Sequence, residues 1–351
     1  MRILSALLVT AAVTSLTVTT IASAGQASDR LFADEAVTAL TLTAPFRAIS
    51  RDRSADPEYR PGTLSYTTIA GTTREFKIKI RPRGKSRRDR KVCSFPPLRL
   101  NLPKGKLDNS VFENQNILKL VTHCKTSEKY QRYLLKEFLV YKMLNVLTPV
   151  SFNVRLLKVS YVDSEKDGEP LERYGFFIEH KKRLAARLDL ATSDVMRIRA
   201  TDLDPWQASI AEVFQYMISN TDYSFIAAPA GDACCHNAII LGPPGGPYAP
   251  VPYDFDRTGM VAPPSALPDE NLGQRNVRDR LYRGFCRDQA VTDRAVDHTV
   301  DKRDELEGLI RNQVGLEEGD KKKFLRYLES YYNIVADEKR RTRALKCRKP
   351  I

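Results

Sequence analysis

Several patterns are missing from this 351-residue sequence, and each absence excludes a class of protein. The chain has only four histidines and no Cys-x-x-Cys pair, so it lacks the ligand spacing of a structural zinc site. It has no Gly-x-Ser-x-Gly motif, the nucleophile pattern of α/β-hydrolases. After residue 24 there is no run of about 18 uncharged apolar residues, so no later segment is expected to span a bilayer.

The first 24 residues predict a cleavable secretory signal peptide. Arg2 supplies the positive start, the segment from Ile3 to Ile21 has no charge, and Ala22-Ser23-Ala24 has the small-x-small pattern of a cleavage site. An uncleaved anchor is the alternative, but the many Thr and Ser residues make this run a poor spanning helix. We therefore expect a secreted or periplasmic protein that starts at Gly25 and has no integral membrane segment once the signal is removed.

The six cysteines all follow the predicted signal peptide. An even number of cysteines in an exported protein indicates disulfides rather than free thiols. We expect at least two disulfides, with Cys93–Cys124 favoured and Cys286 paired with Cys234 or Cys235.

The sequence is basic, with 56 Lys and Arg against 43 Asp and Glu and a net charge of +13. Such a surface permits attraction to phosphates or to anionic components of a cell envelope. A solvated basic surface is the plainer explanation for most of these residues. Because no motif places a helix or stacking aromatics on a nucleic acid, we expect no specific nucleic acid partner.

Hydrophobic periodicity predicts an α+β protein. Strands are expected at 75–80, 98–102, 117–121, 154–162 and 174–178, with one long helix at 128–147 that begins after Ser127. A further helix is expected after Asp204-Pro205, followed by two amphipathic helices between residues 301 and 345. This order suggests a strand-rich part at 25–178 and a mostly helical part at 179–351, with loops at 220–257 in the second part.

Three short polar segments carry the candidate chemistry: Asn220-Thr221-Asp222, His236-Asn237 and Pro252-Tyr253-Asp254-Phe255-Asp256. An aspartate can orient or deprotonate an accepting hydroxyl, and Asn and Asp supply oxygen ligands to a magnesium ion that bridges phosphates. Asp254 and Asp256 could also be calcium ligands or turn residues. His236 could suggest acid–base chemistry, although a lone histidine is more often structural.

In this order the segments resemble those of the kinase-like superfamily, most closely the atypical kinases of the spore coat protein H (CotH) type. The resemblance rests on the three segments above, on Arg83-Gly84-Lys85-Ser86-Arg87 and on the strand from Tyr174 to Glu179. It implies a two-lobed protein-kinase-like fold, with a strand-rich N-lobe that contains one long helix and a mostly helical C-lobe.

The same resemblance implies a role for each candidate residue. Asp222 matches the catalytic aspartate, while Asn237 and Asp254 match residues that bind magnesium. For nucleotide and phosphate binding it implies Gly84 in a loop that covers the phosphates, Lys119 on a strand, Glu137 as the partner of that lysine, and Glu179 between the lobes. Lys119 and Glu137 could otherwise be an unrelated surface ion pair.

We therefore expect an exported phosphotransferase that uses ATP and Mg²⁺ and has an unknown hydroxyl acceptor. A long insertion between Asp222 and Asn237, and the cation Arg257 after the second acidic segment, depart from the family pattern. They favour the alternative, which is a non-catalytic cell-envelope protein that binds an anionic polymer or a protein partner in a basic cleft.

Overall fold

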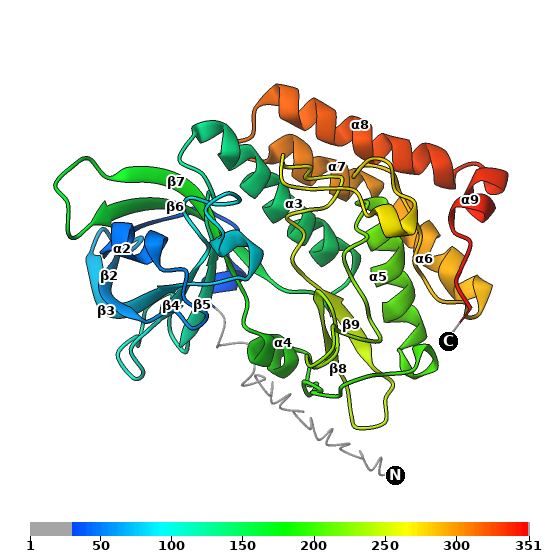
Figure 1. Cartoon of the computed structure of the whole chain (residues 1–351), viewed down its shortest axis with the longest axis horizontal. Coiled ribbons are helices and arrows are strands. Elements are labelled where there is room, and N and C mark those ends of the chain that lie inside the picture. The colour runs from blue at the N-terminus through cyan, green and yellow to red at the C-terminus, as the bar shows by residue number, and fades with distance from the viewer. Residues whose placement is uncertain (1–29, 350–351) are drawn as a thin grey trace, which may run out of the picture.

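The computed structural model describes residues 30–349 of the chain (Figure 1). The predicted signal peptide at residues 1–24, and its cleavage before Gly25, lie outside this range. Among the described residues, no helix has both the length and the apolar character needed to cross a membrane.

The first half of the chain forms a closed β-barrel with the strand order β1-β2-β3-β4-β5-β7-β6. The strands are β1 Thr38–Ala44, β2 Arg60–Thr67, β3 Thr73–Pro82, β4 Leu98–Asn101, β5 Ile117–Val121, β6 Val154–Asp163 and β7 Leu171–Ile178. All neighbours pair antiparallel except β1 and β6, which pair in parallel.

The predicted two-lobed protein-kinase-like fold is wrong, because this closed barrel replaces the open sheet of an N-lobe. The cause is β1, which the local sequence pattern did not reveal. This strand pairs with β6 along its whole length, from Thr38 opposite Leu157 to Ala44 opposite Asp163, and it pairs with β2 on its other side. A strand that joins both edges of a sheet leaves no open edge.

The five predicted strands are confirmed as β3 to β7, with small differences at their ends. Alternation along β3 turns Phe76, Ile78 and Ile80 into the barrel while the lysines between them face outward. These residues pack with Leu42, Leu100 and other buried side chains in a core that fills the barrel. Period-two patterning therefore located these strands correctly, although it did not show that they close.

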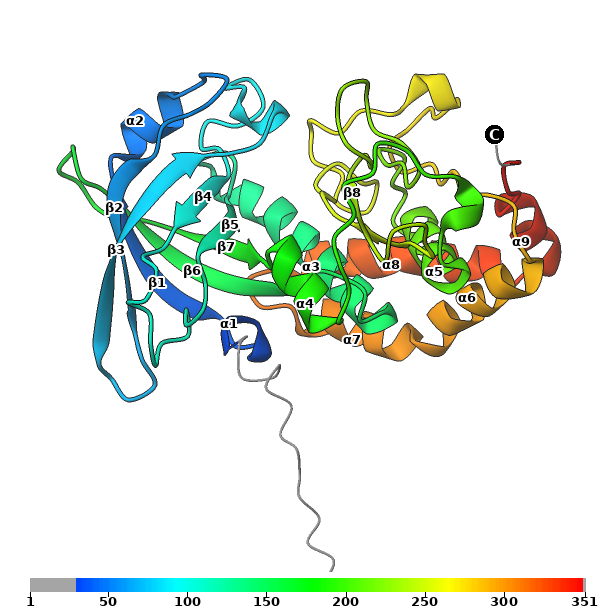
Figure 2. The ribbon, with the colours of Figure 1, turned by 90° about the horizontal axis from the view of Figure 1, so that it is seen from below.

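The long helix α3, Gln131–Leu147, lies between the barrel and the helices of the second half (Figures 1 and 2). The first turn of the predicted helix, Glu128–Tyr130, is a 3-10 turn instead. Most of α3 is buried because it packs on both sides, and Phe138 and Leu144 belong to a core that also holds Phe176 of β7 and Phe255. This helix therefore joins the two halves through one continuous core.

The remaining helices are α1 Arg30–Ala33, α2 Phe46–Arg51, α4 Lys181–Arg187, α5 Pro205–Met217, α6 Gln289–Asp301, α7 Arg303–Asn312, α8 Glu318–Val335 and α9 Glu338–Ala344. The predicted start of α5 is confirmed, since the Asp204 side chain accepts a hydrogen bond from the Gln207 N–H at 2.7 Å. Residues 301–345 hold α7, α8 and α9 rather than two helices. Gly315 separates α7 from α8 with a φ of +75°, and a Cβ there would lie 2.5 Å from the Tyr174 ring.

All six cysteines form disulfides: Cys93–Cys124, Cys234–Cys235 and Cys286–Cys347. The first pairing is confirmed, but the predicted bond between Cys286 and Cys234 or Cys235 is wrong. Cys286 lies beside the C-terminal segment instead, because its N–H donates to the Arg348 carbonyl at 2.7 Å. Three disulfides are typical of a protein that matures in an oxidising compartment.

Candidate functional site

A β-hairpin in the second half brings the three polar segments together. Its strands β8, Ala238–Leu241, and β9, Ala249–Pro252, pair so that Ala238 is opposite Pro252. The next residue pair outward is held by a hydrogen bond from the Tyr253 N–H to the Asn237 carbonyl at 2.9 Å. The Asn237 and Asp254 segments are therefore neighbours at the open end of the hairpin.

Asp222 reaches the same place through a β-bridge between Ser224 and His236. Its carboxylate lies 2.6 Å from Nε2 of His236 and accepts a 3.1 Å hydrogen bond from the Asn237 side-chain amide. The same amide nitrogen donates to the Asp222 carbonyl at 2.7 Å. The insertion between Asp222 and Asn237 therefore does not separate them, because this bridge closes it into a loop.

Asp254 projects from a turn in which its backbone is left-handed, with a φ of +64°. Its N–H donates to the Tyr141 hydroxyl of α3 at 2.9 Å, which fixes the turn against that helix. The residue is exposed to solvent, and its carboxylate lines the cavity described below. Burial raises its pKa, Asp256 and Asp222 raise it further, and Arg87 and Arg83 oppose them.

Gly84, Lys119, Glu137 and Asp254 line a single cavity, so the structure brings together four of the seven candidate residues. The other charged or aromatic lining residues are Arg83, Lys85, Arg87, Tyr141, Phe152, Tyr253 and Asp256. Asp222 and Asn237 do not line this cavity but lie next to it, since Asp222 is close enough to Asp254 to raise its pKa. Six of the seven candidates thus belong to one region.

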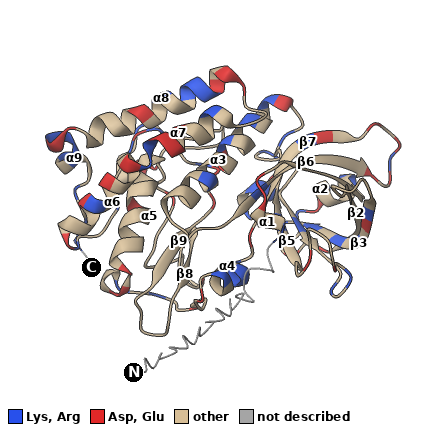
Figure 3. Ribbon diagram, turned by 180° about the vertical axis from the view of Figure 1, so that it is seen from behind, with Lys and Arg blue, Asp and Glu red and all other residues tan. Residues whose placement is uncertain are grey.

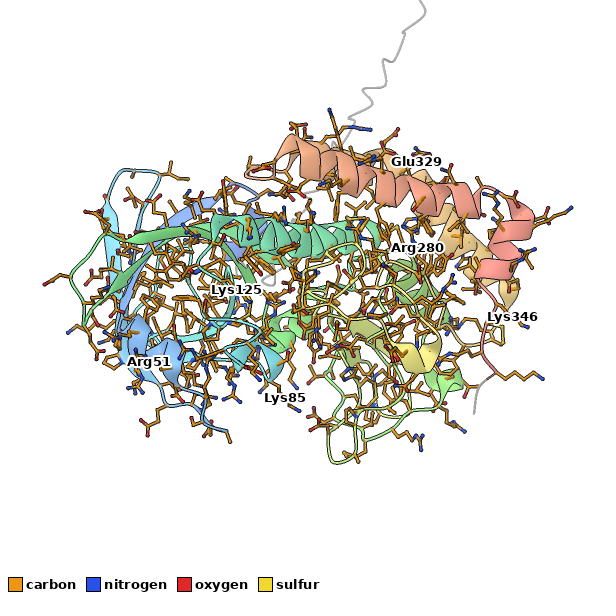
Figure 4. The ribbon with its side chains drawn as sticks, turned by 45° about the horizontal axis from the view of Figure 1, so that its top comes forward. Arg51, Lys85, Lys125, Arg280, Glu329 and Lys346 are labelled. Atoms are coloured by element: carbon orange, nitrogen blue, oxygen red, sulfur yellow. A yellow bond between two sulfur atoms is a disulfide. The ribbon has the colours of Figure 1, made fainter. Side chains whose placement is uncertain are left out.

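The loop that contains Gly84 spans the two halves of the molecule. Lys85 forms an ion pair with Asp232 of the second half, with 3.3 Å between Nζ and Oδ2. Figure 4 labels Lys85 on the side of the barrel that faces the second half. Gly84 has a φ of +91°, a conformation that other residues rarely adopt. The loop therefore lines the cavity on the barrel side and also reaches the second half.

Lys119 lies on β5, which pairs with β4 on one side and β7 on the other. It is opposite Arg99 of β4 and Ile178 of β7. In the part of the chain that the structure describes, Nζ forms no ion pair with a carboxylate, and it lies 5.8 Å from the centre of the Tyr253 ring. Burial lowers the pKa of Lys119 to about 8, with Arg83 and Arg99 acting in the same direction and Asp254 against them. Lys119 is thus a desolvated cation available to an anion.

The predicted ion pair between Lys119 and Glu137 is absent, because Arg87 takes the place of the lysine. The Arg87 guanidinium bridges two carboxylates, with 2.8 Å from Nη2 to Glu137 and 2.6 Å from Nε to Asp256. Burial alone would lower the pKa of Arg87, but Asp256 and Glu137 raise it well above its ordinary value. The planar fork of arginine suits such a bridge better than the point charge of a lysine.

Glu179 is the candidate that the structure does not bring to the cavity. Its carboxylate is fully buried and is bound by the Arg187 guanidinium at 3.0 and 3.1 Å and by the Asn153 N–H at 3.0 Å. These contacts tie the end of β7 to α4. Its role in this structure is to anchor the connection between the two halves.

Tyr141 and the two arginines of the Gly84 loop are site residues that the sequence analysis did not assign. Tyr141 lies four residues after Glu137, so the two share one face of α3, and this spacing could have identified it. The bridge that Arg87 makes to Glu137 and Asp256 depends on the fold of the loop around Ser86–Arg88, for which the sequence offers no comparable signal.

No group of three or more His, Cys, Asp or Glu residues suited to a metal ion occurs within residues 30–349. The segments at the end of the hairpin carry three side chains with oxygen atoms that can bind a cation, those of Asn237, Asp254 and Asp256. This set suits Mg²⁺, which takes one or two protein carboxylates and completes its shell with water and phosphate. Burial raises the pKa of Asp254 and the neighbouring Asp256 raises it further, and a bound divalent cation would offset both effects.

A comparison of the sequence with protein-family models finds no match, and neither does a comparison with curated proteins. The chemistry of the site must therefore be inferred from its geometry.

Proposed function

We propose that this protein is an exported, Mg²⁺-dependent phosphotransferase that binds a nucleotide such as ATP and transfers the terminal phosphoryl group to a hydroxyl acceptor. The observation that carries the proposal is the opposition of charges in one cavity, with Lys119 and Arg83 facing Asp254 and with Asp222 beside them. The proposal rests on this site and on the motif order shared with the CotH-type kinases, and it does not require a kinase-like fold.

The barrel side of the cavity supplies the groups that would bind phosphate. Lys119 and Arg83 are cations whose pKa values are both lowered, first by burial. A phosphate placed between them would offset the loss of water and the repulsion between the two charges. The Gly84 loop brings backbone close to the same position, as phosphate-binding loops do.

The hairpin side supplies the groups that would hold the metal. Asp254 and Asn237 would bind Mg²⁺, with Asp256 nearby as a further carboxylate. When bound, the ion supplies positive charge that neutralises the phosphate oxygens during transfer. Arg87 keeps Asp256 in place and balances part of the negative charge.

Asp222 would act on the acceptor. Its side chain is about half exposed, so an acceptor hydroxyl can reach it, and His236 and Asn237 hold it in one orientation. The acceptor oxygen forms a bond to the terminal phosphorus while the bond to the bridging oxygen breaks, which releases a nucleoside diphosphate. The hydroxyl proton passes to the Asp222–His236 pair.

The alternative, a non-catalytic binding protein of the cell envelope, has one observation in its favour. Basic residues also lie on α4, which contains Lys181 and Lys182 and carries blue in Figure 3. Lys181 is close enough to Lys119 to lower its pKa. A long anionic polymer could use this extended charge, whereas a nucleotide needs only the cavity. The disulfides fit a secreted or periplasmic location in both cases.

The proposal is tested by comparing Asp222→Asn with the wild-type protein for ATP binding by calorimetry and for ADP release in the presence of Mg²⁺. We expect the variant to bind ATP as the wild type does and to release ADP at least about 100-fold more slowly. The reason is that the Asp222 carboxylate acts only when the acceptor hydroxyl loses its proton, after ATP has bound. Asp167→Asn, in the exposed turn before β7, is the matched control. A wild-type protein that binds a teichoic acid but not ATP would contradict the proposal and support the alternative.

A further inference from the structure

A second cavity lies on the far side of the Arg87 bridge. Arg87, Glu137 and Asp256 line both cavities and so form the wall between them. The second cavity has a volume of about 180 Å³. Its remaining lining comes from the residues at 91–93, 122–125, 130–134 and 261–265. We call it the tyrosine pocket, after Tyr130 and Tyr133.

The interior of the tyrosine pocket is mostly apolar. Val92, Leu134 and Val261 contribute aliphatic surface, and the rings of Tyr130 and Tyr133 meet edge to face with 5.7 Å between their centres. Aromatic side chains in this arrangement offer good contact to a further ring. An apolar cavity of about 150 Å³ is large enough to hold benzene. The tyrosine pocket therefore has room for a ligand with a single aromatic ring.

The charges around the pocket favour an anion. Lys91 and Lys125 are part of its lining, and neither forms an ion pair with a carboxylate of the described residues. The Lys125 ammonium donates to the Lys91 carbonyl at 3.3 Å and lies 5.5 Å from the centre of the Tyr130 ring. Figure 4 labels Lys125 between the barrel and α3. The lining carboxylates of Glu137 and Asp256 both form ion pairs with Arg87.

One buried polar side chain in the wall lacks a partner. His123 is fully buried, and neither ring nitrogen has a hydrogen-bond partner among the described residues. The ring stacks on Phe95 with 4.6 Å between centres. Burial lowers the pKa of His123 to about 3, so the ring is neutral at ordinary pH and carries one donor and one acceptor. A few polar groups in an apolar lining are typical of pockets that bind small molecules.

We propose that the tyrosine pocket binds a small aromatic carboxylate, with its ring packed against Tyr133 and Leu134 and its carboxylate near Lys91 and Lys125. The ring buries apolar surface that the pocket already offers, and the carboxylate meets the two lysines that have no acidic partner. This site is separate from the proposed phosphotransferase cavity and does not depend on its activity.

The test is ¹⁹F NMR of 4-fluorobenzoate with the full chain, without nucleotide or Mg²⁺. The matched ligand is 4-fluorobenzamide, which has the same ring and no charge. We expect the protein to broaden the fluorobenzoate signal and to bind fluorobenzamide about three- to tenfold more weakly. The double variant Lys91→Gln/Lys125→Gln should weaken fluorobenzoate binding by a similar factor and leave fluorobenzamide unchanged. Lys129→Gln, an exposed lysine outside the pocket, is the control and should change neither.

A second variant tests the position of the ring. Ser265 lines the pocket, and Ser265→Trp would fill part of it, whereas Ser265→Ala would not. We expect the tryptophan variant to lose binding of both ligands and the alanine variant to keep it, with far-UV circular dichroism like that of the wild type. Equal binding of the two ligands, fluorobenzoate binding that survives the lysine changes, or no binding by the wild type would each overturn the proposal. Because no nucleotide is present, these outcomes are independent of phosphotransferase activity.

Discussion

The two walls of the candidate cavity are built in different ways. On the barrel wall, Lys119 lies within a regular strand and its position is fixed by pairing on both sides. On the hairpin wall, Asp254 lines the cavity and Asn237 lies next to it; both have left-handed backbones, with φ of +64° and +50°, outside the strands. Asn and Asp tolerate this conformation better than most residues. Strand register therefore places Lys119, whereas turns and local hydrogen bonds place Asn237 and Asp254.

The first prediction concerns the disulfides, whose removal should change the free energy of unfolding more than any other variant considered. Cys286–Cys347 closes a span of 61 residues in the second half, and Cys93–Cys124 closes 31 residues next to the barrel. Loop-closure entropy predicts that Cys286→Ser/Cys347→Ser lowers the free energy of unfolding by about 4 kcal/mol. The loss for Cys93→Ser/Cys124→Ser should be smaller than this by about 0.6 kcal/mol, because its loop is shorter. Urea denaturation of the two double variants measures this difference. A larger loss for the pair beside the barrel would contradict the order.

The second prediction concerns the loss of the Arg87 side chain, which bridges Glu137 and Asp256. Arg87→Ala leaves the buried Glu137 carboxylate without its cation, so we expect a loss of about 3 kcal/mol in the free energy of unfolding. Lys85→Ala breaks an exposed ion pair in the same loop and should cost less than about 1 kcal/mol. Thermal and urea denaturation compare the two. Equal, small losses for both variants would mean that Arg87 is not buried against Glu137 in solution.

The third prediction concerns the pH dependence of ATP affinity and tests the role of Lys119 on the barrel wall. Lys119 is charged below its pKa of about 8 and loses its proton above it. If its charge binds phosphate, the affinity for ATP should fall about tenfold between about pH 7 and pH 9, since a neutral lysine must first regain a proton. Lys119→Arg keeps its charge throughout this range and should show a flatter profile. Calorimetry at several pH values measures both, and identical profiles would exclude Lys119 from the phosphate site.

The sequence predicted most local elements of the fold and most of the site, but not how the barrel closes. Strands β3 to β7 and helix α3 follow from alternation and helical spacing. The start of β2 contains Pro61 and Gly62, two residues that are unfavourable in strands, so the pattern did not predict this strand. The parallel pairing of β1 with β6 joins segments more than 100 residues apart. A local sequence pattern does not predict pairing between distant segments such as β1 and β6. The predicted kinase-like fold was wrong because this pairing closes the barrel.

The same distinction applies within the site. The sequence could predict the position of Lys119 because this residue belongs to a strand. It could predict the position of Asp254 because this residue belongs to a short acidic segment that follows a strand. The partner of Glu137 could not, because Arg87 reaches it from an irregular loop whose path depends on the rest of the fold. Likewise, the contact between Asp222 and Asn237 depends on a β-bridge across an insertion, and their separation in the sequence concealed it.

The most direct test of the account is the Mg²⁺ dependence of ATP affinity in the wild type and in Asp254→Ala, measured by calorimetry with Mg²⁺ and with EDTA. If the hairpin wall holds the metal and the barrel wall holds the phosphates, Mg²⁺ strengthens ATP binding to the wild type. The variant should then bind ATP with one weaker affinity that Mg²⁺ does not change, while its circular dichroism remains that of the wild type. A folded variant whose ATP affinity still rises with Mg²⁺ as much as that of the wild type would contradict the account.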